Sequence, residues 1–380
     1  MPELGEVAHA AKLLSANLKG KIISKFVTDA RDALVFSSIS PQERSKIEQS
    51  YVSKTIADIG RHGKYFWIIL GGGRESVAKT QNVILMHFGM TGWLTIRDVH
   101  THFFPMERSR NGQKPDNYDE KAEAEPWPPK YNKFLLGTDD GVEMAFTDPR
   151  RLSRIRFLEI ASNSTKNDLE TPEEIENELM KLEPLVRMGP DFSKLESRWS
   201  QDQFLEVLSK RKVPIKSLLL DQAVCAGVGN WMADEILFQS RIHPEQYTDK
   251  MSLAKKQLLY NMLCEVCEVA VETEGNTDKF PKSWLMLHRW SKRQKKGERP
   301  MTADGHIVDF VTVGGRTSCF VPKLQTLENA THESNNAGEG KRGVKENSRA
   351  KRPKTESTED DDVKPARTRR RSRQGARQDD

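Results

Sequence analysis

The hydrophobic pattern changes its period near residue 171, and this change constrains the fold more than any other feature. Before it, short β-rich runs such as KYFWIIL and NVILMHFG alternate with turn-like stretches such as GGGR and DDG. After it, segments such as SQDQFLEVLSK and NWMADEILFQS carry apolar residues at helical spacing. Regular short strands with turns between them are typical of a sandwich or barrel. We therefore predict an α+β protein with a β part followed by a helical part.

Composition shifts divide the chain further. Apolar residues at helical spacing within the first 20 residues predict an N-terminal helix, and the long, polar, Pro- and Glu-rich stretch near 99–130 predicts an inserted surface loop. The last segment lacks aromatics and is dense in mixed charge, so it is predicted to be disordered. The expected parts are a β-sandwich (1–160), a helical domain (171–285), a basic stretch ending in a β-hairpin (286–327) and the tail (328–380).

Net charge says little about the partners of the folded part. The chain carries +5, of which +4 (14 Lys and Arg against 10 Asp and Glu) lies in residues 331–380. Local clusters must therefore carry any argument for nucleic-acid binding. No apolar run is long enough to span a bilayer, and Glu3 and Glu6 exclude a secretory start, so we expect a soluble intracellular protein.

The four cysteines do not form a disulfide framework. Cys264 and Cys267 make a CxxC pair inside LLYNMLCEVCEVAVE, which is predicted to be a helix. A zinc site needs about four ligands, and neither a second CxxC nor a nearby Cys/His pair would complete one. We therefore expect two small apolar side chains in a helix, with neither metal nor cofactor.

The chain begins MPELGEV, which places Pro2 next to the initiator. Aminopeptidases commonly remove Met before a small residue, and removal would expose Pro2 as a secondary amine. An α-amino group has a pKa of about 8, so much of it is neutral at physiological pH and able to attack an electrophilic carbon. Glu3 beside it is placed to move protons. Taken alone, this start fits an ordinary terminus better than a nucleophile.

Two further motifs are suited to phosphate binding. LDQAVCAGVGN places a Gly-rich turn before Asn230, at the start of a predicted helix, and SKRKVPIK upstream contains Arg211 and Lys216. GGRTSCFVPKLQ would project Arg316 from a tight turn, where a guanidinium is suited to clamping a phosphate. A capped helical hairpin with a solvated basic face, and an exposed turn arginine, are the plain alternatives.

Taken together, these pieces resemble the formamidopyrimidine-DNA glycosylases of the Fpg/Nei family. MPELGEV, GRHGKYF, MHFGMTGWL, FTDPRRL, LDQAVCAGVGN and GGRTSCFVPKLQ follow one another in that family's order, over roughly residues 1–325. The resemblance implies a β-sandwich, a helix-two-turn-helix domain and a β-hairpin finger. Because the hairpin stretch lacks the finger cysteines, it resembles the plant and fungal branch with a zincless finger.

By this resemblance the protein is a bifunctional DNA glycosylase and AP lyase acting on oxidised bases in damaged double-stranded DNA. Pro2 is implied as the nucleophile at C1′, Glu3 as the proton donor and Glu6 as a residue that orients the N-terminal segment. Lys64 in RHGKYF is implied to draw a phosphate toward Pro2. The resulting iminium would acidify the C2′ proton and permit β- and δ-elimination.

The resemblance also assigns contacts with DNA. Asn230 and Arg316 are implied to grip the phosphates flanking the lesion, Arg211 to contact DNA, and His87 to contact a phosphate. The side chains implied to fill the space left by the flipped nucleotide are Met90, Arg150 and Leu152.

This sequence departs from the family pattern at two of these places. Leu152 stands where the family usually has Phe, so we expect a different preference for the opposite base. Ordinary core packing is the alternative for Met90 and Leu152. Gly5 replaces the second proline of the N-terminal motif and is expected to loosen a segment that should be rigid.

The tail and the catalytic class leave alternatives open. KRPK at 351–354 and RTRRRSR at 367–373 are suited to importin recognition, DNA binding or both, so we expect a nuclear monomer. One alternative function is an endonuclease VIII-like enzyme that prefers oxidised pyrimidines. Another is a protein that binds damaged DNA and has lost catalysis.

Overall fold

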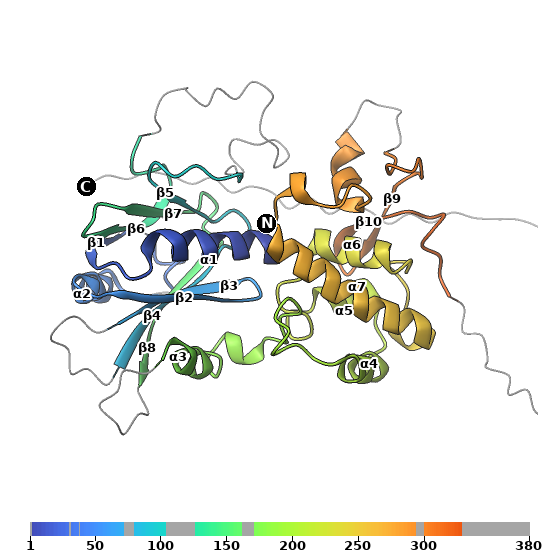
Figure 1. The fold of residues 1–380 in the computed structure, drawn as a ribbon, viewed down its shortest axis with the longest axis horizontal. Helices are drawn as coiled ribbons and strands as arrows, with labels where there is room; N and C mark the ends of the chain where they lie inside the picture. Colours follow the sequence, from blue (N-terminus) through green and yellow to red (C-terminus); the bar gives the residue numbers. More distant parts are fainter. Residues whose placement is uncertain are drawn as a thin grey trace, which may run out of the picture. The chain divides into compact units, whose positions relative to one another are not determined.

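The computed structural model describes residues 2–29, 32–37, 39–71, 80–103, 126–161, 171–293 and 300–328 (Figure 1). The middle of the predicted insert, 104–125, and the tail from residue 329 lie outside these ranges. Within them, no helix has the length and apolar character needed to cross a membrane.

Two four-stranded antiparallel sheets form the N-terminal part (Figure 1), as the short β-rich runs predict. The first sheet has the order β1 (Ile23–Thr28), β6 (Asn132–Thr138), β7 (Glu143–Thr147) and β5 (Trp93–Ile96). The second has the order β2 (Ile56–His62), β3 (Tyr65–Leu70), β4 (Thr80–His87) and β8 (Arg154–Ala161). Alternate residues of each strand face the core between the sheets, for example Phe66 and Ile68 from β3.

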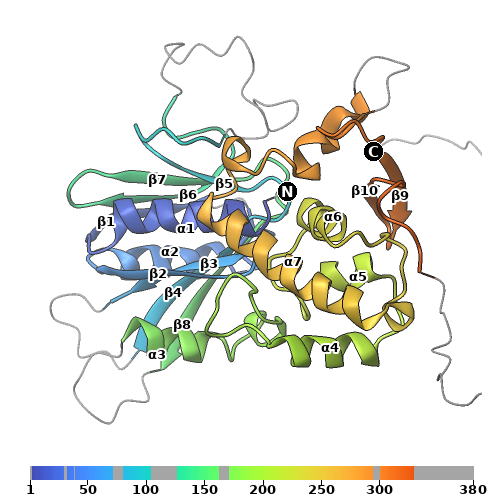
Figure 2. The ribbon, with the colours of Figure 1, turned by 45° about the vertical axis from the view of Figure 1, so that its right-hand side comes forward.

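Helix α1 (Leu4–Leu18) begins at a capping box, in which the Glu3 carboxylate accepts from the N–H of Glu6 and the Glu6 carboxylate from the N–H of Glu3. Its apolar face, including Val7 and Leu14, packs into the sandwich core. The first turns of α1 lie against the end of α7 (Leu253–Glu272) in the helical part (Figure 2). The N-terminus is thereby held where the two parts meet.

Helix α2 (Pro41–Tyr51) interrupts the run of strands and was not predicted. It has a complete start signal, since Ser40 caps it and Pro41 occupies its first position. Its sequence is almost wholly polar and presents no apolar stripe, so hydrophobic periodicity could not reveal it. Its buried residues are Arg44 and Tyr51.

Helix α3 (Pro172–Leu179) differs from the predicted division at residue 171. Ile175 and Leu179 pack with Trp67 and Leu85 on the outer face of the second sheet. By packing, α3 therefore belongs to the β part. Periodicity identified the helix but could not show which core it covers.

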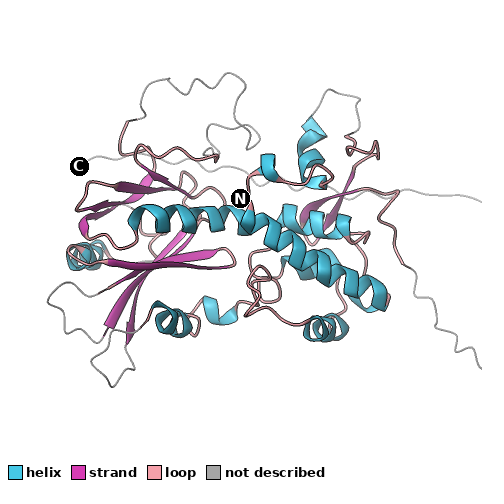
Figure 3. Cartoon of the chain, in the orientation of Figure 1, coloured by secondary structure: helices cyan, strands magenta, loops and turns pink. Residues whose placement is uncertain are grey.

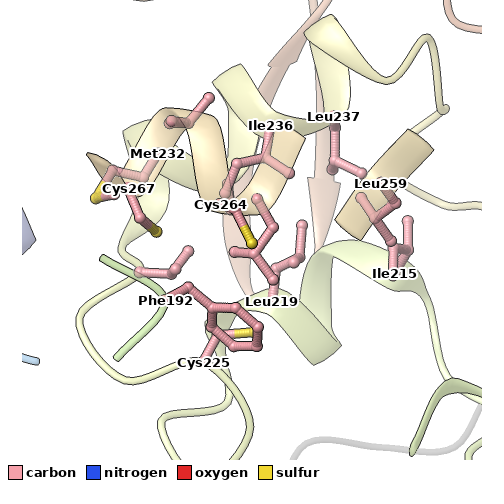
Figure 4. Packing of buried hydrophobic residues seen from close by; sticks show 14 of the residues in the cluster. Phe192, Ile215, Leu219, Cys225, Met232, Ile236, Leu237, Leu259, Cys264 and Cys267 are labelled. Atoms are coloured by element: carbon pink, nitrogen blue, oxygen red, sulfur yellow. The ribbon is translucent and has the colours of Figure 1, made fainter. Parts of the chain in front are cut away.

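Four helices build the helical part: α4 (Gln201–Lys210), α5 (Ile215–Leu220), α6 (Asn230–Gln239) and α7. Figure 3 shows these helices in cyan and the strands of the sandwich in magenta. Short 3₁₀ segments occupy Leu185–Arg187, Thr248–Lys250, Thr277–Lys279 and Leu285–Arg293. Cys225, Cys264 and Cys267 are buried in the core of this part, beside Phe192 and Leu219 (Figure 4). The CxxC pair is thus apolar filling in a helix, as predicted.

The predicted β-hairpin is formed by β9 (Asp309–Val313) and β10 (Arg316–Phe320). Gly314 and Gly315 join the strands with φ of +56° and +73°, the left-handed conformation that a tight two-residue hairpin turn requires. A Cβ on Gly314 would lie 2.6 Å from the Ser217 hydroxyl of α5, so the turn sits directly on the helical part. Contacts between β10 and α6 hold the hairpin against the start of α6.

Candidate active site and nucleic-acid interface

Glu3 connects the start of α1 with the start of α6. Its carboxylate accepts hydrogen bonds from the main-chain N–H groups of Trp231 and Met232, at 3.1 and 3.2 Å. Only 3% of Glu3 is exposed. Free N–H groups and the positive end of the helix dipole both favour a carboxylate at this place. The sequence predicted an anion at this helix start; in the structure the protein's own Glu3 occupies it.

Gly229 makes this approach possible. A Cβ at this position would lie 2.1 Å from the Glu3 carboxyl carbon, far inside van der Waals contact. The AGVGN turn therefore needs glycine at position 229, because the Glu3 side chain lies directly against this residue.

Gly227 and Gly63 form a second close approach. Their φ values are +93° and +57°, and a Cβ on Gly63 would lie 2.8 Å from the Gly227 nitrogen. Because Gly63 is in the β2–β3 turn, this contact joins the sandwich to the turn before α6. The buried Asp191 carboxylate reinforces it by accepting from the Gly63 N–H at 3.0 Å and from Arg61.

Lys64 follows Gly63 and is brought to the same place. Its ammonium donates to the Val228 carbonyl at 2.9 Å, and the residue is 8% exposed. Burial lowers the pKa of Lys64 below its usual value. The attraction of the Glu3 and Glu6 carboxylates opposes this effect only in part. The predicted set of Glu3, Glu6 and Lys64 is therefore gathered around the first residues of the chain.

The Glu6 carboxyl faces the same N-terminal segment. It accepts the Glu3 N–H at 3.0 Å. Burial, followed by repulsion from the Glu3 carboxylate, raises the pKa of Glu6 to about 7. Two carboxyls one helical turn apart thus differ in environment: Glu3 meets helix N–H groups, while Glu6 is held in poorly solvated surroundings. Pro2, half-buried, directly precedes them.

A cleft of about 370 Å³ opens beside Lys64. Its lining comes from both parts of the chain: Lys64, Tyr65, His87, Met188, Leu220, Gln222, Asn230 and Arg316. The Asn230 amide donates to the Thr317 carbonyl at 3.0 Å, and its side-chain oxygen has no hydrogen-bond partner among the described residues. Arg316 extends exposed from the hairpin. The cleft thus brings together Lys64, Asn230 and Arg316, which belong to three motifs that lie far apart in the sequence.

Four lining residues were missed by sequence reasoning: Tyr65, Met188, Leu220 and Gln222. Tyr65 was detectable, because it follows Lys64 in the GKYF motif. Gln222 also lies inside a recognised motif, where its amide donates to the Val228 carbonyl at 2.9 Å. Met188 and Leu220 sit in ordinary apolar surroundings and carried no signal.

His87 is placed on the cleft as a neutral hydrogen-bond donor. Burial, with the nearby positive charges of Lys64 and Arg154, lowers the pKa of His87 to about 4. Its Nδ1 accepts the Gly89 N–H at 3.0 Å, which leaves the proton on Nε2. A neutral imidazole in this state can donate to an anion throughout the physiological pH range.

Met90, Arg150 and Leu152 lie on two loops that contact each other. Thr91 donates to Asp148 at 2.7 Å, and the same buried carboxylate accepts the Ser153 N–H at 2.7 Å. Met90 is partly exposed, Arg150 is exposed and Leu152 is 38% exposed. Neither Met90 nor Leu152 is therefore a fully buried core residue, and their contact with DNA stays a prediction.

Lys216 requires a correction. It was predicted to contact DNA, but its side chain has no exposed surface. Its ammonium donates to the Asp234 carboxylate and to the Asn230 carbonyl, the latter at 2.8 Å. Lys216 therefore supports α6 from within the core. Arg211 is partly exposed and pairs with Asp221 at 2.6 Å, and its contact with DNA stays a prediction.

Gly5 also differs from the expectation. It lies inside α1, and a Cβ there would come within 2.6 Å of the Ala270 carbonyl of α7. The absence of a side chain lets the two helices approach closely. Gly5 thus fixes the N-terminal segment against the helical part instead of loosening it.

The two-sheet domain and the helices that close on one cleft have the fold of the helix-two-turn-helix DNA glycosylases. A structure of MutM in complex with DNA containing carbocyclic 8-oxo-G superposes with a TM-score of 0.60 at 20% identity, covering 86% of this chain and all of that chain. A structure of Lactococcus lactis Fpg bound to DNA containing an AP site gives 0.59 at 20% identity, covering 85% and 99%.

Sequence comparison defines the family. Residues 1–155 match the formamidopyrimidine-DNA glycosylase N-terminal domain, and residues 188–282 match its H2TH domain. A formamidopyrimidine-DNA glycosylase of Arabidopsis thaliana is 35% identical over 346 residues, 91% of this chain and 76% of that protein. One from Geotalea daltonii is 28% identical over 332 residues, 86% of this chain and all of that protein. The chain belongs to the formamidopyrimidine-DNA glycosylase family.

Proposed function

We propose that this protein is a bifunctional DNA glycosylase and AP lyase that excises oxidised bases from duplex DNA in base excision repair. Formamidopyrimidines are the proposed main substrates and 8-oxoguanine a further one. Family membership supports this activity. The observation that carries the proposal is the Glu3 carboxylate at the start of α6, which holds the first residues of the chain beside Lys64 and the cleft.

The proposed chemistry begins when Met1 is removed and the Pro2 nitrogen becomes a secondary amine. The nitrogen attacks C1′, the bond from C1′ to the damaged base breaks, and the sugar ring opens to give an iminium. Glu3 lies next to Pro2 and supplies the proton that this exchange requires. Loss of the C2′ proton then expels the 3′ phosphate by β-elimination, and δ-elimination expels the 5′ phosphate.

Phosphate grips would hold the substrate in place for this attack. Asn230 and Arg316 line the cleft from α6 and the hairpin, and Lys64 and the neutral donor His87 line it from the sandwich. Charge-assisted hydrogen bonds from such groups position a DNA strand and favour extrusion of a nucleotide. Met90, Arg150 and Leu152, on their coupled loops, would then fill the vacated space in the duplex.

A panel of duplexes tests the proposal. We expect excision and nicking with duplexes containing formamidopyrimidine, with 3′- and 5′-phosphate ends as the products of double elimination. Faster excision of thymine glycol than of formamidopyrimidine or 8-oxoguanine would favour the endonuclease VIII-like alternative. Binding of all three duplexes without nicking would favour the catalytically inactive alternative and contradict the proposal.

We propose that the hairpin positions Arg316 without a metal, as a zincless finger. Val308, Cys319 and Val321 pack with Phe238 and Leu285 in a small apolar core, which supports a metal-independent hairpin. In the described ranges, no group of three His, Cys, Asp or Glu side chains is arranged to hold a metal ion. Dialysis against a strong chelator should leave excision unchanged; a loss restored by Zn²⁺ would contradict the zincless assignment.

We also propose that the protein acts as a monomer in the nucleus, with the basic clusters at 351–354 and 367–373 recognised by an importin. Clustered Lys and Arg in a polar segment support this address. Replacing the basic residues of 367–373 with alanine in a fluorescent fusion should move the signal to the cytoplasm, and an unchanged nuclear signal would contradict the role of that cluster.

A further inference from the structure

The outer face of the second sheet is covered along most of its length. Trp67 from β3 and Leu85 from β4 are buried beneath a cluster that includes Ile175 and Leu179 of α3. The cover thins at the last row of the sheet, where Tyr65 packs against the edge of this cluster and stays partly exposed. That row lies at the cleft, where Tyr65 and His87 form part of the lining.

The last row contains one residue from each of three neighbouring strands. Tyr65 of β3 pairs with His87 of β4, and His87 pairs with Arg154 of β8. All three side chains point to the same outer face, because directly paired residues share a face in an antiparallel sheet. Strands lie about 4.8 Å apart, so the row extends about 10 Å from Tyr65 to Arg154.

Arg154 carries a positive charge that the protein leaves available. It is exposed, and its guanidinium donates to the carbonyl of its own neighbour Ser153 at 2.7 Å. In the part of the chain that the structure describes, it has no ion pair. By contrast, Arg151 is held by Asp32 at 3.0 Å, and Arg156, on the same face of β8, donates to the Glu183 carbonyl at 3.2 Å. Among the described residues, Arg154 thus differs from both of these arginines, because its one hydrogen bond goes to the adjacent residue Ser153.

The row has the chemistry of a phosphate-binding strip. His87 presents a neutral N–H and Tyr65 a partly exposed phenol, and Arg154 adds the fork of donors that binds phosphate best. The strip is continuous with Lys64, which precedes Tyr65 at the cleft. A duplex strand rises about 3.4 Å per nucleotide and also winds around the axis, which separates successive phosphates by roughly 6–7 Å, so 10 Å corresponds to about one or two nucleotides.

We propose that Arg154, at the end of this strip, binds a backbone phosphate of the damaged strand about one or two nucleotides beyond the phosphates held at the cleft. This inference rests on the proposed function and extends the site beyond the phosphates gripped at Asn230 and Arg316. Its effect is on DNA affinity and register, since Arg154 is too far along the strip to touch the reacting sugar.

Salt dependence of binding tests the assignment. The probe is a duplex containing the stable abasic analogue tetrahydrofuran, and its Kd is measured by fluorescence anisotropy at several salt concentrations. R154A should weaken binding about ten-fold and reduce the slope of log K against log salt by about 0.9, the value for one lost phosphate contact. R154K should restore most of the slope. R97A is the matched control, because Arg97 is an exposed arginine paired with Glu143 on the other sheet, and its slope should equal that of wild type.

Neutral phosphates locate the contact. Replacing single phosphates by methylphosphonates should weaken wild-type binding at one position, about one or two nucleotides beyond the phosphates held at the cleft, and R154A should be insensitive there. An unchanged salt slope in R154A, or the same methylphosphonate profile in both proteins, would overturn the inference. Borohydride trapping of an abasic duplex is run in parallel: wild type and R154A should both form the adduct at saturating protein. If wild type formed no adduct, the proposed function would be contradicted. Trapping therefore distinguishes a failure of the proposed function from a failure of the Arg154 inference.

Discussion

Gly229→Ala gives a sharp test of how the active site is built. The new Cβ would lie 2.1 Å from the Glu3 carboxyl carbon, whereas ordinary contact begins at about 3.4 Å, so the two must separate by about 1.3 Å. The hydrogen bonds from Trp231 and Met232, at 3.1 and 3.2 Å, do not survive such a shift. The substitution should therefore detach Glu3 from the start of α6.

The expected loss of activity follows from those two bonds. A hydrogen bond to a charged group contributes about 1.5–3 kcal/mol, so losing both removes roughly 3–6 kcal/mol of positioning energy. If even half of this acts in the transition state, the rate falls at least about ten-fold, and a 1 Å misplacement of a catalytic group commonly costs about 100-fold. We expect a decrease of about 100-fold or more in the single-turnover excision rate.

The assay compares single-turnover excision from a formamidopyrimidine duplex with thermal unfolding of the same protein. Gly71→Ala is the control, because its new Cβ would meet its nearest neighbour at an ordinary 3.7 Å. Overpacking at Gly229 should also destabilise the fold by about 1–3 kcal/mol, so rates are measured well below the midpoint of unfolding. A folded Gly229→Ala protein that excises within three-fold of wild type would refute the reasoning.

Three further predictions follow from buried groups. Lys216→Met should destabilise the protein by about 3 kcal/mol in urea unfolding, because it leaves the Asp234 carboxylate with one partner fewer, while the salt slope of DNA binding stays that of wild type. Gly5→Ala should lower the unfolding midpoint, because its Cβ would meet the Ala270 carbonyl at 2.6 Å and push α1 from α7. The Glu6 pKa, raised from 4.5 to about 7, means that the folded protein holds a proton there that the unfolded chain releases. Stability in chemical denaturation should therefore fall as pH rises through that interval, and Glu6→Gln should remove this part of the slope.

Local patterns predicted the elements of the fold well where apolar residues carried the signal. Seven of the eight strands in the two sheets, α1 and the β9–β10 hairpin follow from alternation, helical spacing and paired glycines. Strand β2, with the sequence IADIGRH, was not predicted, because its polar residues and Gly60 interrupt the apolar alternation. The polar helix α2 was not predicted, because its Ser40 cap is the main sequence signal for it and it has no apolar stripe. The assignment of α3 to the sheet depends on which apolar surface lies opposite, and one sequence does not contain that information.

The site shows the same division between local and distant information. Motif resemblance identified Glu3, Lys64 and Arg316 as members of one site, and the structure brings them together. It could not show that Lys216, one of several basic residues in SKRKVPIK, turns inward to Asp234. Nor could it show that Gly5 and Gly229 are required by atoms distant in sequence, because a close approach exists only after folding.

Covalent trapping tests the central claim most directly. Wild-type protein is incubated with a duplex containing an abasic site and borohydride, and the mass of the N-terminal peptide is then measured. The account predicts a reduced sugar adduct on the nitrogen of Pro2 as the first residue, and loss of the adduct in Pro2→Gly or in a protein that retains an N-terminal tag. An adduct on a lysine, or an undiminished adduct when the Pro2 nitrogen is blocked, would contradict it.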